Sequence, residues 1–115
     1  MSDVLEDLYA TLQQRKRADA SSSYVAKLYS EGVDKILKKI GEEASETIIA
    51  AKGSDRGALV HELADLWFHS LVLMAAKDIP LSDLNAELAR RQGRSGLDEK
   101  AERPASGQPR ASRSK

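Results

Sequence analysis

The sequence predicts an all-α protein built as a bundle of four or five helices. Apolar residues recur at the three- and four-residue spacing of amphipathic helices through most of the first 91 residues. No stretch alternates polar and apolar residues with the period of a strand, and no Asn-Gly or Asp-Gly pair marks a hairpin turn. The chain also contains no Walker loop and no dinucleotide-binding glycine fingerprint.

Length and charge narrow the class of protein. A chain of 115 residues is long enough for one domain with a modest core. The 18 Lys and Arg residues balance the 18 Asp and Glu residues, so no global field favours a nucleic acid or membrane partner. The absence of cysteine excludes disulfides, thiolate metal sites and a cysteine nucleophile. No secretion signal or segment long enough to span a bilayer is recognised, so a cytoplasmic location is expected.

The first two helices are expected to be short. Residues 3–17 carry apolar side chains at helical spacing and predict an amphipathic helix. The polar run Ala18–Ser23 interrupts that pattern, and its serines can cap a following helix. Apolar residues between Tyr24 and Tyr29 predict this second helix, which should end near Gly32.

The third helix is expected to run from Val33 to Lys52. Its core stripe comprises seven residues at helical spacing: Val33, Ile36, Leu37, Ile40, Ala44, Ile48 and Ala51. Ile49 points away from this stripe. A second apolar direction on one helix indicates a second partner surface, as in a helical dimer.

The fourth helix, which follows the loop Lys52–Gly57 and ends before Pro80, is expected to be buried. Apolar residues cover nearly its whole circumference, which is typical of a helix surrounded by other helices. Glu62, Asp65 and His69 fall on the one polar strip that remains. We therefore expect these three side chains inside the protein.

A last helix is expected over Leu81–Arg91, with Leu84 and Leu88 as its apolar contacts. The helical domain should thus span residues 1–91. Residues 92–100 form a basic, glycine-containing segment that either folds over a polyphosphate or is a solvated tail. Residues 101–115 are rich in Pro, Ser, Gly and Arg, a composition that predicts disorder.

Carboxylates on the two long helices form the candidate metal site. Folding these helices back on each other about Ser54 puts Glu43 level with Asp65. The same fold puts Glu46 level with Glu62. Such a cluster of like charges is unfavourable unless a cation neutralises it, and an all-oxygen ligand set favours Mg²⁺ or Mn²⁺ over zinc. Ordinary surface charge, the alternative, explains neither the matched levels nor the apolar surroundings.

A lysine and two histidines near these acids are further candidates. Lys39 projects on the side of Glu43 and Glu46, where it either pairs with the acids or binds a phosphate. His69 is either a core histidine bonded to a polar neighbour, or a residue that contacts the substrate or supports one of the metal-binding carboxylates. His61 is expected to be structural or to face solvent. Because the chain has 2 histidines and no cysteine, a zinc hydrolase is poorly supported.

Several motifs give the chain a family resemblance. Glu43-x-x-Glu46 followed by Glu62-x-x-Asp65 resembles the metal signature of the all-α nucleoside triphosphate pyrophosphohydrolases, the MazG-like superfamily. Within it, the chain is similar to the phosphoribosyl-ATP pyrophosphohydrolases from about Leu5 to Lys100. This narrower similarity lies in Ser23-Tyr24 and in the runs KILKKIGEEASETIIAAK, HELADLWFHSLVLM and LARRQGRSGLDEK.

The resemblance implies a reaction and roles for named residues. Phosphoribosyl-ATP would be hydrolysed to phosphoribosyl-AMP and pyrophosphate, the second step of histidine biosynthesis, by a homodimer with sites near the interface. Glu42 would orient or deprotonate the attacking water. The metal ligands implied for Mg²⁺ are Glu43, Glu46, Glu62 and Asp65. The phosphate-binding candidates are Lys39, Arg91, Arg94 and Lys100.

Two other functions stay open at the level of sequence. A related housecleaning enzyme would use the same metal cluster on free or damaged nucleoside triphosphates. A non-catalytic helical dimerisation module would need no divalent metal. Metal-dependent release of pyrophosphate separates the module from both enzymes, and the choice of substrate separates the enzymes from each other.

Overall fold

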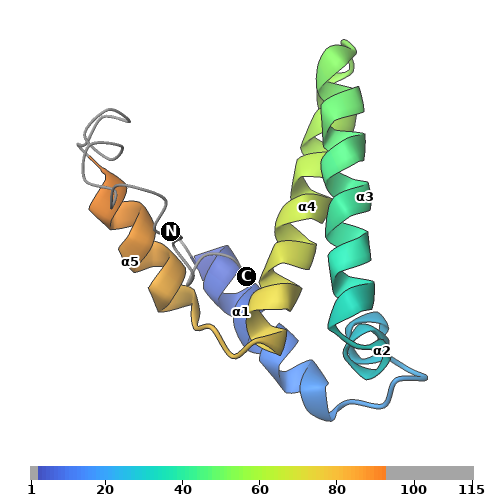
Figure 1. Ribbon diagram of the computed structural model, residues 1–115, viewed down its shortest axis with the longest axis vertical. Coiled ribbons are helices and arrows are strands. Elements are labelled where there is room, and N and C mark those ends of the chain that lie inside the picture. Colours follow the sequence, from blue (N-terminus) through green and yellow to red (C-terminus); the bar gives the residue numbers. More distant parts are fainter. Residues whose placement is uncertain (1–2, 93–115) are drawn as a thin grey trace, which may run out of the picture. The chain divides into compact units, whose positions relative to one another are not determined.

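The computed structural model describes residues 3–92, all of whose regular elements are helical (Figure 1). In chain order they are α1 (Asp3–Gln14), the 3₁₀ helix η1 (Arg15–Arg17), α2 (Tyr24–Glu31), α3 (Val33–Lys52), α4 (Arg56–Ala76) and α5 (Leu81–Arg91). The all-α prediction is confirmed. Contacts divide the chain into two units, one through Leu81 and one from Ser82 onward.

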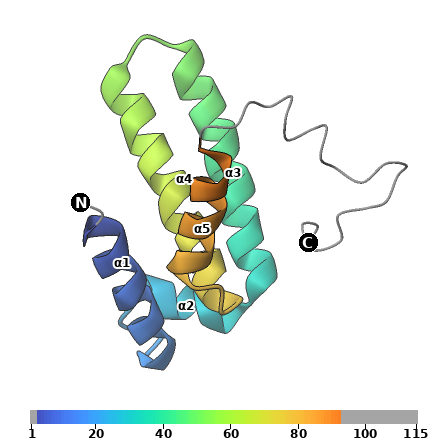
Figure 2. The same ribbon diagram turned by 90° about the vertical axis from the view of Figure 1, so that its left-hand side faces the viewer.

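The two long helices α3 and α4 form an antiparallel hairpin (Figures 1 and 2). The loop between them contains Ser54, the residue about which the sequence predicted the chain to fold back. The Asp55 side chain caps α4 by accepting a hydrogen bond of 3.0 Å from the backbone N–H of Ala58. A short loop with a defined cap fixes which residues of α3 and α4 face each other.

The amino-terminal elements pack at the end of this hairpin that is remote from its loop. As predicted, a serine begins α2: Ser23 accepts a hydrogen bond of 3.1 Å from the N–H of Ala26. The Tyr29 hydroxyl donates to the Leu12 carbonyl at 2.8 Å and so ties α2 to α1. Gly32 has a φ of 99°, a left-handed conformation that favours glycine and lets α3 begin directly after α2.

The segment that follows α4 is held against α1. The Tyr9 hydroxyl donates to the Ile79 carbonyl. Lys16 forms an ion pair of 2.9 Å with Asp78. The buried core lies nearby, and its most enclosed large side chains come from α1, α2, α3 and α4: Leu12, Leu28, Ile36 and Val72.

Two expectations about burial are wrong for the single chain. Within the predicted core stripe of α3, Ile48 is 65% exposed and Leu37 is also exposed. On α4, which was expected to be buried, Val60 is 56% and Trp67 53% exposed. The reason is that, within the unit that ends at Leu81, α3 and α1 cover only part of α4.

The length and composition of α4 also correct the expectation that no segment could span a bilayer. By these two criteria alone, its 21 residues would suffice. However, α4 packs along α3 and carries Glu62, Asp65 and the buried His69. This single helix therefore gives no positive sign of a membrane.

Candidate metal centre

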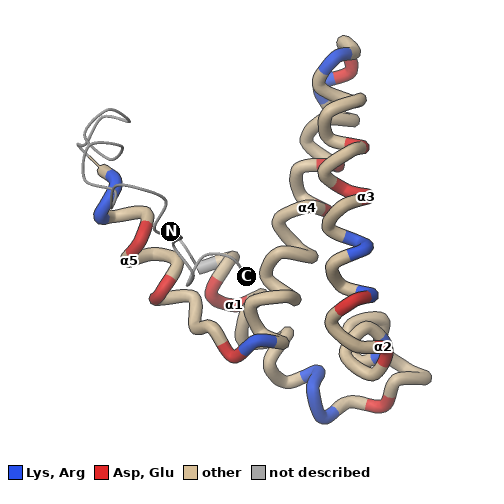
Figure 3. Tube along the Cα trace, viewed as in Figure 1, with Lys and Arg blue, Asp and Glu red and all other residues tan. Residues whose placement is uncertain are grey.

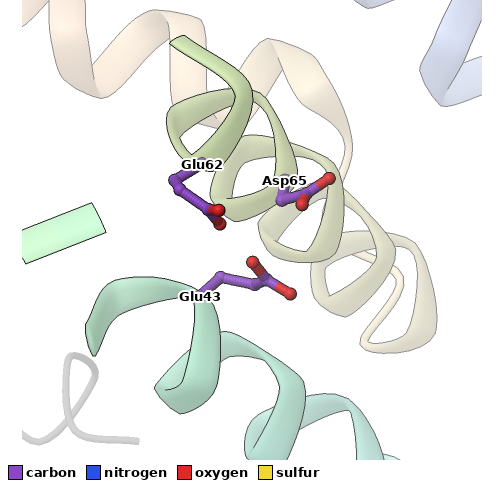
Figure 4. A group of neighbouring side chains, drawn as sticks. All are labelled: Glu43, Glu62 and Asp65. Atoms are coloured by element: carbon purple, nitrogen blue, oxygen red, sulfur yellow. The ribbon is translucent and has the colours of Figure 1, made fainter. Parts of the chain in front are cut away.

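Three carboxylates from the facing helices converge at one level of the hairpin. Glu43 comes from α3, and Glu62 and Asp65 come from α4 (Figure 4). One oxygen atom from each lies within 4.8 Å of the others. Such an arrangement matches the ligand geometry that an oxygen-preferring divalent cation needs.

Two carboxylate oxygens in this cluster lack a hydrogen-bond partner. The Oε1 atoms of Glu43 and Glu62 are buried, and neither has a partner among the described residues. Glu43 as a whole is only 6% exposed. A buried polar atom without a partner is unfavourable by about 1–3 kcal/mol, and more when it is charged. A bound divalent cation would satisfy both oxygens, so the donor set fits a metal ion.

Glu46, the fourth expected ligand, lies outside the group of three. It is exposed, whereas Glu43, one turn earlier on α3, is buried. Its carboxylate nevertheless interacts with Glu62. Burial, followed by the hydrogen bond and charge of Glu46, raises the pKa of the Glu62 carboxyl, and the nearby His61 opposes this rise. Glu46 is thus a neighbour of the cluster at its solvent side.

His61 contacts this cluster directly. Its Nε2 atom lies 3.3 Å from the Asp65 carboxylate, one helical turn further along α4. The sequence predicted a structural or solvent-facing position for His61, and the side chain is exposed as one of these alternatives has it, but the contact with Asp65 was not predicted. The i, i+4 spacing of the two residues was the signal that would have revealed the contact.

A tyrosine and a histidine connect α2 to the carboxylate cluster. The Tyr24 hydroxyl lies 2.8 Å from Nε2 of the buried His69, and Nδ1 of His69 lies 3.0 Å from the Asp65 carbonyl. Because a carbonyl can only accept, Nδ1 carries the proton in the neutral ring and Nε2 accepts from Tyr24. His69 is therefore a buried histidine bonded to a polar neighbour, one of its two predicted roles. The sequence singled out Tyr24 only within a family motif.

Lys39 and Glu42 lie beside the cluster on α3. They form an ion pair of 3.4 Å, which is the acid-pairing role considered for Lys39. The neighbouring Tyr24 and then the hydrogen bond to Glu42 raise the pKa of Lys39, while burial opposes this rise. Lys39 is thus held in its charged form at the edge of the carboxylates.

The structure does not test whether the other three phosphate-binding candidates reach this site. Arg91 belongs to α5, in the second unit, where its Nε donates to Glu87 at 2.9 Å. Hydrogen bonds from Arg90 and Arg91 lower the pKa of Glu87 to about 2. Arg94, Lys100 and the tail 101–115 lie outside the described residues, so the roles predicted for them stay predictions.

Comparison with known proteins gives consistent matches along the chain. Residues 5–92 match the family model described as phosphoribosyl-ATP pyrophosphohydrolase. A phosphoribosyl-ATP pyrophosphatase of Geobacter metallireducens is 53% identical over 102 residues, which cover 89% of this chain and 94% of the relative. Those of Novosphingobium aromaticivorans and Methylococcus capsulatus are each 54% identical over 101 residues, covering 88% of this chain and 94% and 96% of the relatives.

Proposed function

The chain belongs to the phosphoribosyl-ATP pyrophosphohydrolase family, and on that basis we propose that it hydrolyses phosphoribosyl-ATP to phosphoribosyl-AMP and pyrophosphate. This reaction is the second step of histidine biosynthesis. The observation that carries the proposal is the pair of buried oxygens on Glu43 and Glu62, which have no hydrogen-bond partner within residues 3–92 and fit a metal ion in an enzyme of this family.

The metal in this proposal is Mg²⁺, with Mn²⁺ as the alternative of similar ligand preference. Glu43, Glu62 and Asp65 supply the three converging ligands, and Glu46 supplies the fourth from the solvent side. When bound, the ion supplies charge neutralisation at the phosphate oxygens and at the leaving pyrophosphate. The antiparallel hairpin holds these carboxylates in place before the substrate arrives.

The neighbouring residues act on the water and the phosphates. Glu42, exposed beside Glu43, orients or deprotonates the water that attacks between the α- and β-phosphorus atoms. Lys39, which forms an ion pair with Glu42, is proposed to bind a phosphate oxygen of the same substrate. Arg91, Arg94 and Lys100 are proposed to add positive charge from the carboxy-terminal segment.

A second copy of this chain is the partner that we propose for the exposed face of α4. An apolar groove of about 400 Å³ runs between α1 and α4, lined by Val4, Leu5, Leu8, Val60, Leu63, Ala64, Trp67, Phe68 and Leu71. Continuous exposed apolar surface of this kind marks an interaction site. A homodimer would cover it. The balanced charge and the small soluble substrate favour a cytoplasmic enzyme without nucleic acid or membrane partners.

Pyrophosphate release from phosphoribosyl-ATP tests this function. Purified protein with Mg²⁺ should release pyrophosphate, and a chelator should abolish the release. The value of kcat/KM for phosphoribosyl-ATP should exceed that for ATP by about 10³-fold, if two charge-assisted contacts of about 2 kcal/mol each recognise the second ribose phosphate. Equal turnover of ATP, dCTP or dUTP would favour the housecleaning enzyme. No metal-dependent release from any of these substrates would favour the dimerisation module.

A further inference from the structure

A cavity of about 310 Å³ lies between α2 and α3, apart from the three converging carboxylates. Three lysines line it, Lys27 from α2 and Lys35 and Lys39 from α3. Two carboxylates, Glu31 and Glu42, also line it, together with Tyr24 and Leu28. We call this space the lysine cavity.

Two of these lysines have no ion-pair partner in the part of the chain that the structure describes. The carboxylate of Glu42 pairs with Lys39. Lys27 and Lys35 are exposed, and neither forms an ion pair within residues 3–92. Glu31 is the one other acid of the cavity, so the lysines exceed the carboxylates by one. The cavity therefore attracts an anion.

The lysine cavity adjoins the metal centre. On α3, Lys35, Lys39 and Glu43 follow at intervals of one helical turn, which puts Lys35 about 12 Å along the axis from Glu43. Figure 3 shows basic positions together with one acidic position on the half of α3 nearer α2, where Asp34 lies in the first turn, and acidic positions further along. Tyr24 joins the two sites, because it lines the cavity and bonds to His69, which contacts the carbonyl of Asp65.

We propose that the lysine cavity binds the second ribose phosphate of phosphoribosyl-ATP, and that Lys27 and Lys35 determine specificity for it. This inference rests on the proposed function, because it assumes that the triphosphate lies at the metal centre. The second phosphate is separated from the triphosphate by a ribose, an adenine and another ribose. Lys35, which lies two helical turns from Glu43, suits a substrate whose two anionic ends are so far apart.

Lysine ammonium groups on flexible stems suit this task. A phosphate monoester is close to a dianion at neutral pH, and charge-assisted hydrogen bonds from lysine bind it as point charges. Lys39 is already paired, so Lys27 and Lys35 provide the new contacts. Each contact should change affinity at least about tenfold.

Binding of the product tests the proposal separately from catalysis. Phosphoribosyl-AMP keeps the second ribose phosphate but lacks the leaving pyrophosphate, and AMP lacks both. Without divalent metal, calorimetry should show tighter binding of phosphoribosyl-AMP than of AMP. The double variant Lys27→Ala/Lys35→Ala should reduce this preference at least about 100-fold and keep its affinity for AMP. Lys52→Ala, which removes an exposed charge in the last turn of α3, is the matched control.

A variant that is expected to tighten binding of phosphoribosyl-AMP strengthens the test. Glu31→Gln removes a negative charge from the lysine cavity and should tighten binding of phosphoribosyl-AMP severalfold, with AMP unaffected. Unchanged binding of phosphoribosyl-AMP in the double lysine variant would overturn the proposal. An equal loss for phosphoribosyl-AMP and AMP would also overturn it, because the lysines would then contact the α-phosphate.

Failure of this inference is distinguishable from failure of the proposed function. If the wild-type protein releases no pyrophosphate from phosphoribosyl-ATP, the proposed function is wrong. If it does, and the double lysine variant keeps its KM for phosphoribosyl-ATP, only the assignment of Lys27 and Lys35 is wrong. The expected result is a raised KM for phosphoribosyl-ATP with little change in KM for ATP.

Discussion

Replacing Glu43 with glutamine should change stability in opposite directions with and without metal. In the metal-free protein, the buried Oε1 atom of Glu43 has no partner among the described residues and lies near the carboxylates of Glu62 and Asp65. Glu43→Gln removes this charge and its repulsion while nearly preserving the side-chain volume. We expect a gain of about 1 kcal/mol, at the lower end of the cost of an unsatisfied buried polar group.

With metal bound, the Glu43→Gln variant should instead be less stable than wild type. An ion at one hundred times its dissociation constant stabilises the folded state by about 2.7 kcal/mol. Glu43→Gln removes one of the three converging carboxylates and should lose most of this stabilisation by the metal ion. The variant is therefore expected to be about 1 kcal/mol more stable than wild type in chelator and about 1–2 kcal/mol less stable in saturating Mg²⁺.

Thermal unfolding measures both differences. For a chain of this size, 1 kcal/mol corresponds to a shift in Tm of roughly 4 °C. Glu6→Gln, a change at an exposed position on α1, is the matched control and should respond to Mg²⁺ as wild type does. If Glu43→Gln kept the full stabilisation by Mg²⁺, or were less stable than wild type in chelator, Glu43 would not be a metal ligand held in a repulsive cluster.

Three further results are expected. Burial and Glu46 raise the pKa of Glu62 in the folded protein. The contribution of Glu62 to stability is therefore greatest below its unfolded pKa and is lost as pH rises through the folded pKa. Glu62→Gln should raise the Tm of metal-free protein at neutral pH, and this gain should vanish in acid. Truncation after Ala101 should leave turnover unchanged, whereas truncation after Arg91 should raise KM because it removes Arg94 and Lys100. Equal behaviour of the two truncations would show that residues 92–100 do not bind the phosphates. Trp67→Glu should yield monomers in sedimentation, and an unchanged mass would place the dimer interface elsewhere.

The helices were predictable because their signals are local. Apolar spacing and the long run from Val33 to Lys52 reproduced the bounds of α3, and the serine cap before Tyr24 marked the start of α2. The convergence of Glu43 with Asp65 was also predictable, since two helices joined by a short loop can meet only in a narrow range of registers. This part of the site needed no knowledge of side-chain packing.

The burial of α4 and the contact between Tyr24 and His69 were not predictable in this way. Periodicity shows that a face is apolar, but whether Trp67 is covered depends on how many helices are present to surround it. Tyr24 and His69 are 45 residues apart, and their contact depends on how α2 packs beneath the hairpin. A local pattern carries no information about such a contact.

The order of charges on α3 bears on the proposal that one helix binds a metal ion and a distant phosphate together. An ammonium group next to Mg²⁺ would weaken metal binding, yet Lys35 is about two turns from Glu43, beyond the Debye length of about 8 Å at physiological salt. The nearer Lys39 forms its ion pair with Glu42, which offsets its charge on the side of the metal. Under this proposal, Lys35 can bind a phosphate without lowering the affinity of the carboxylates for the cation.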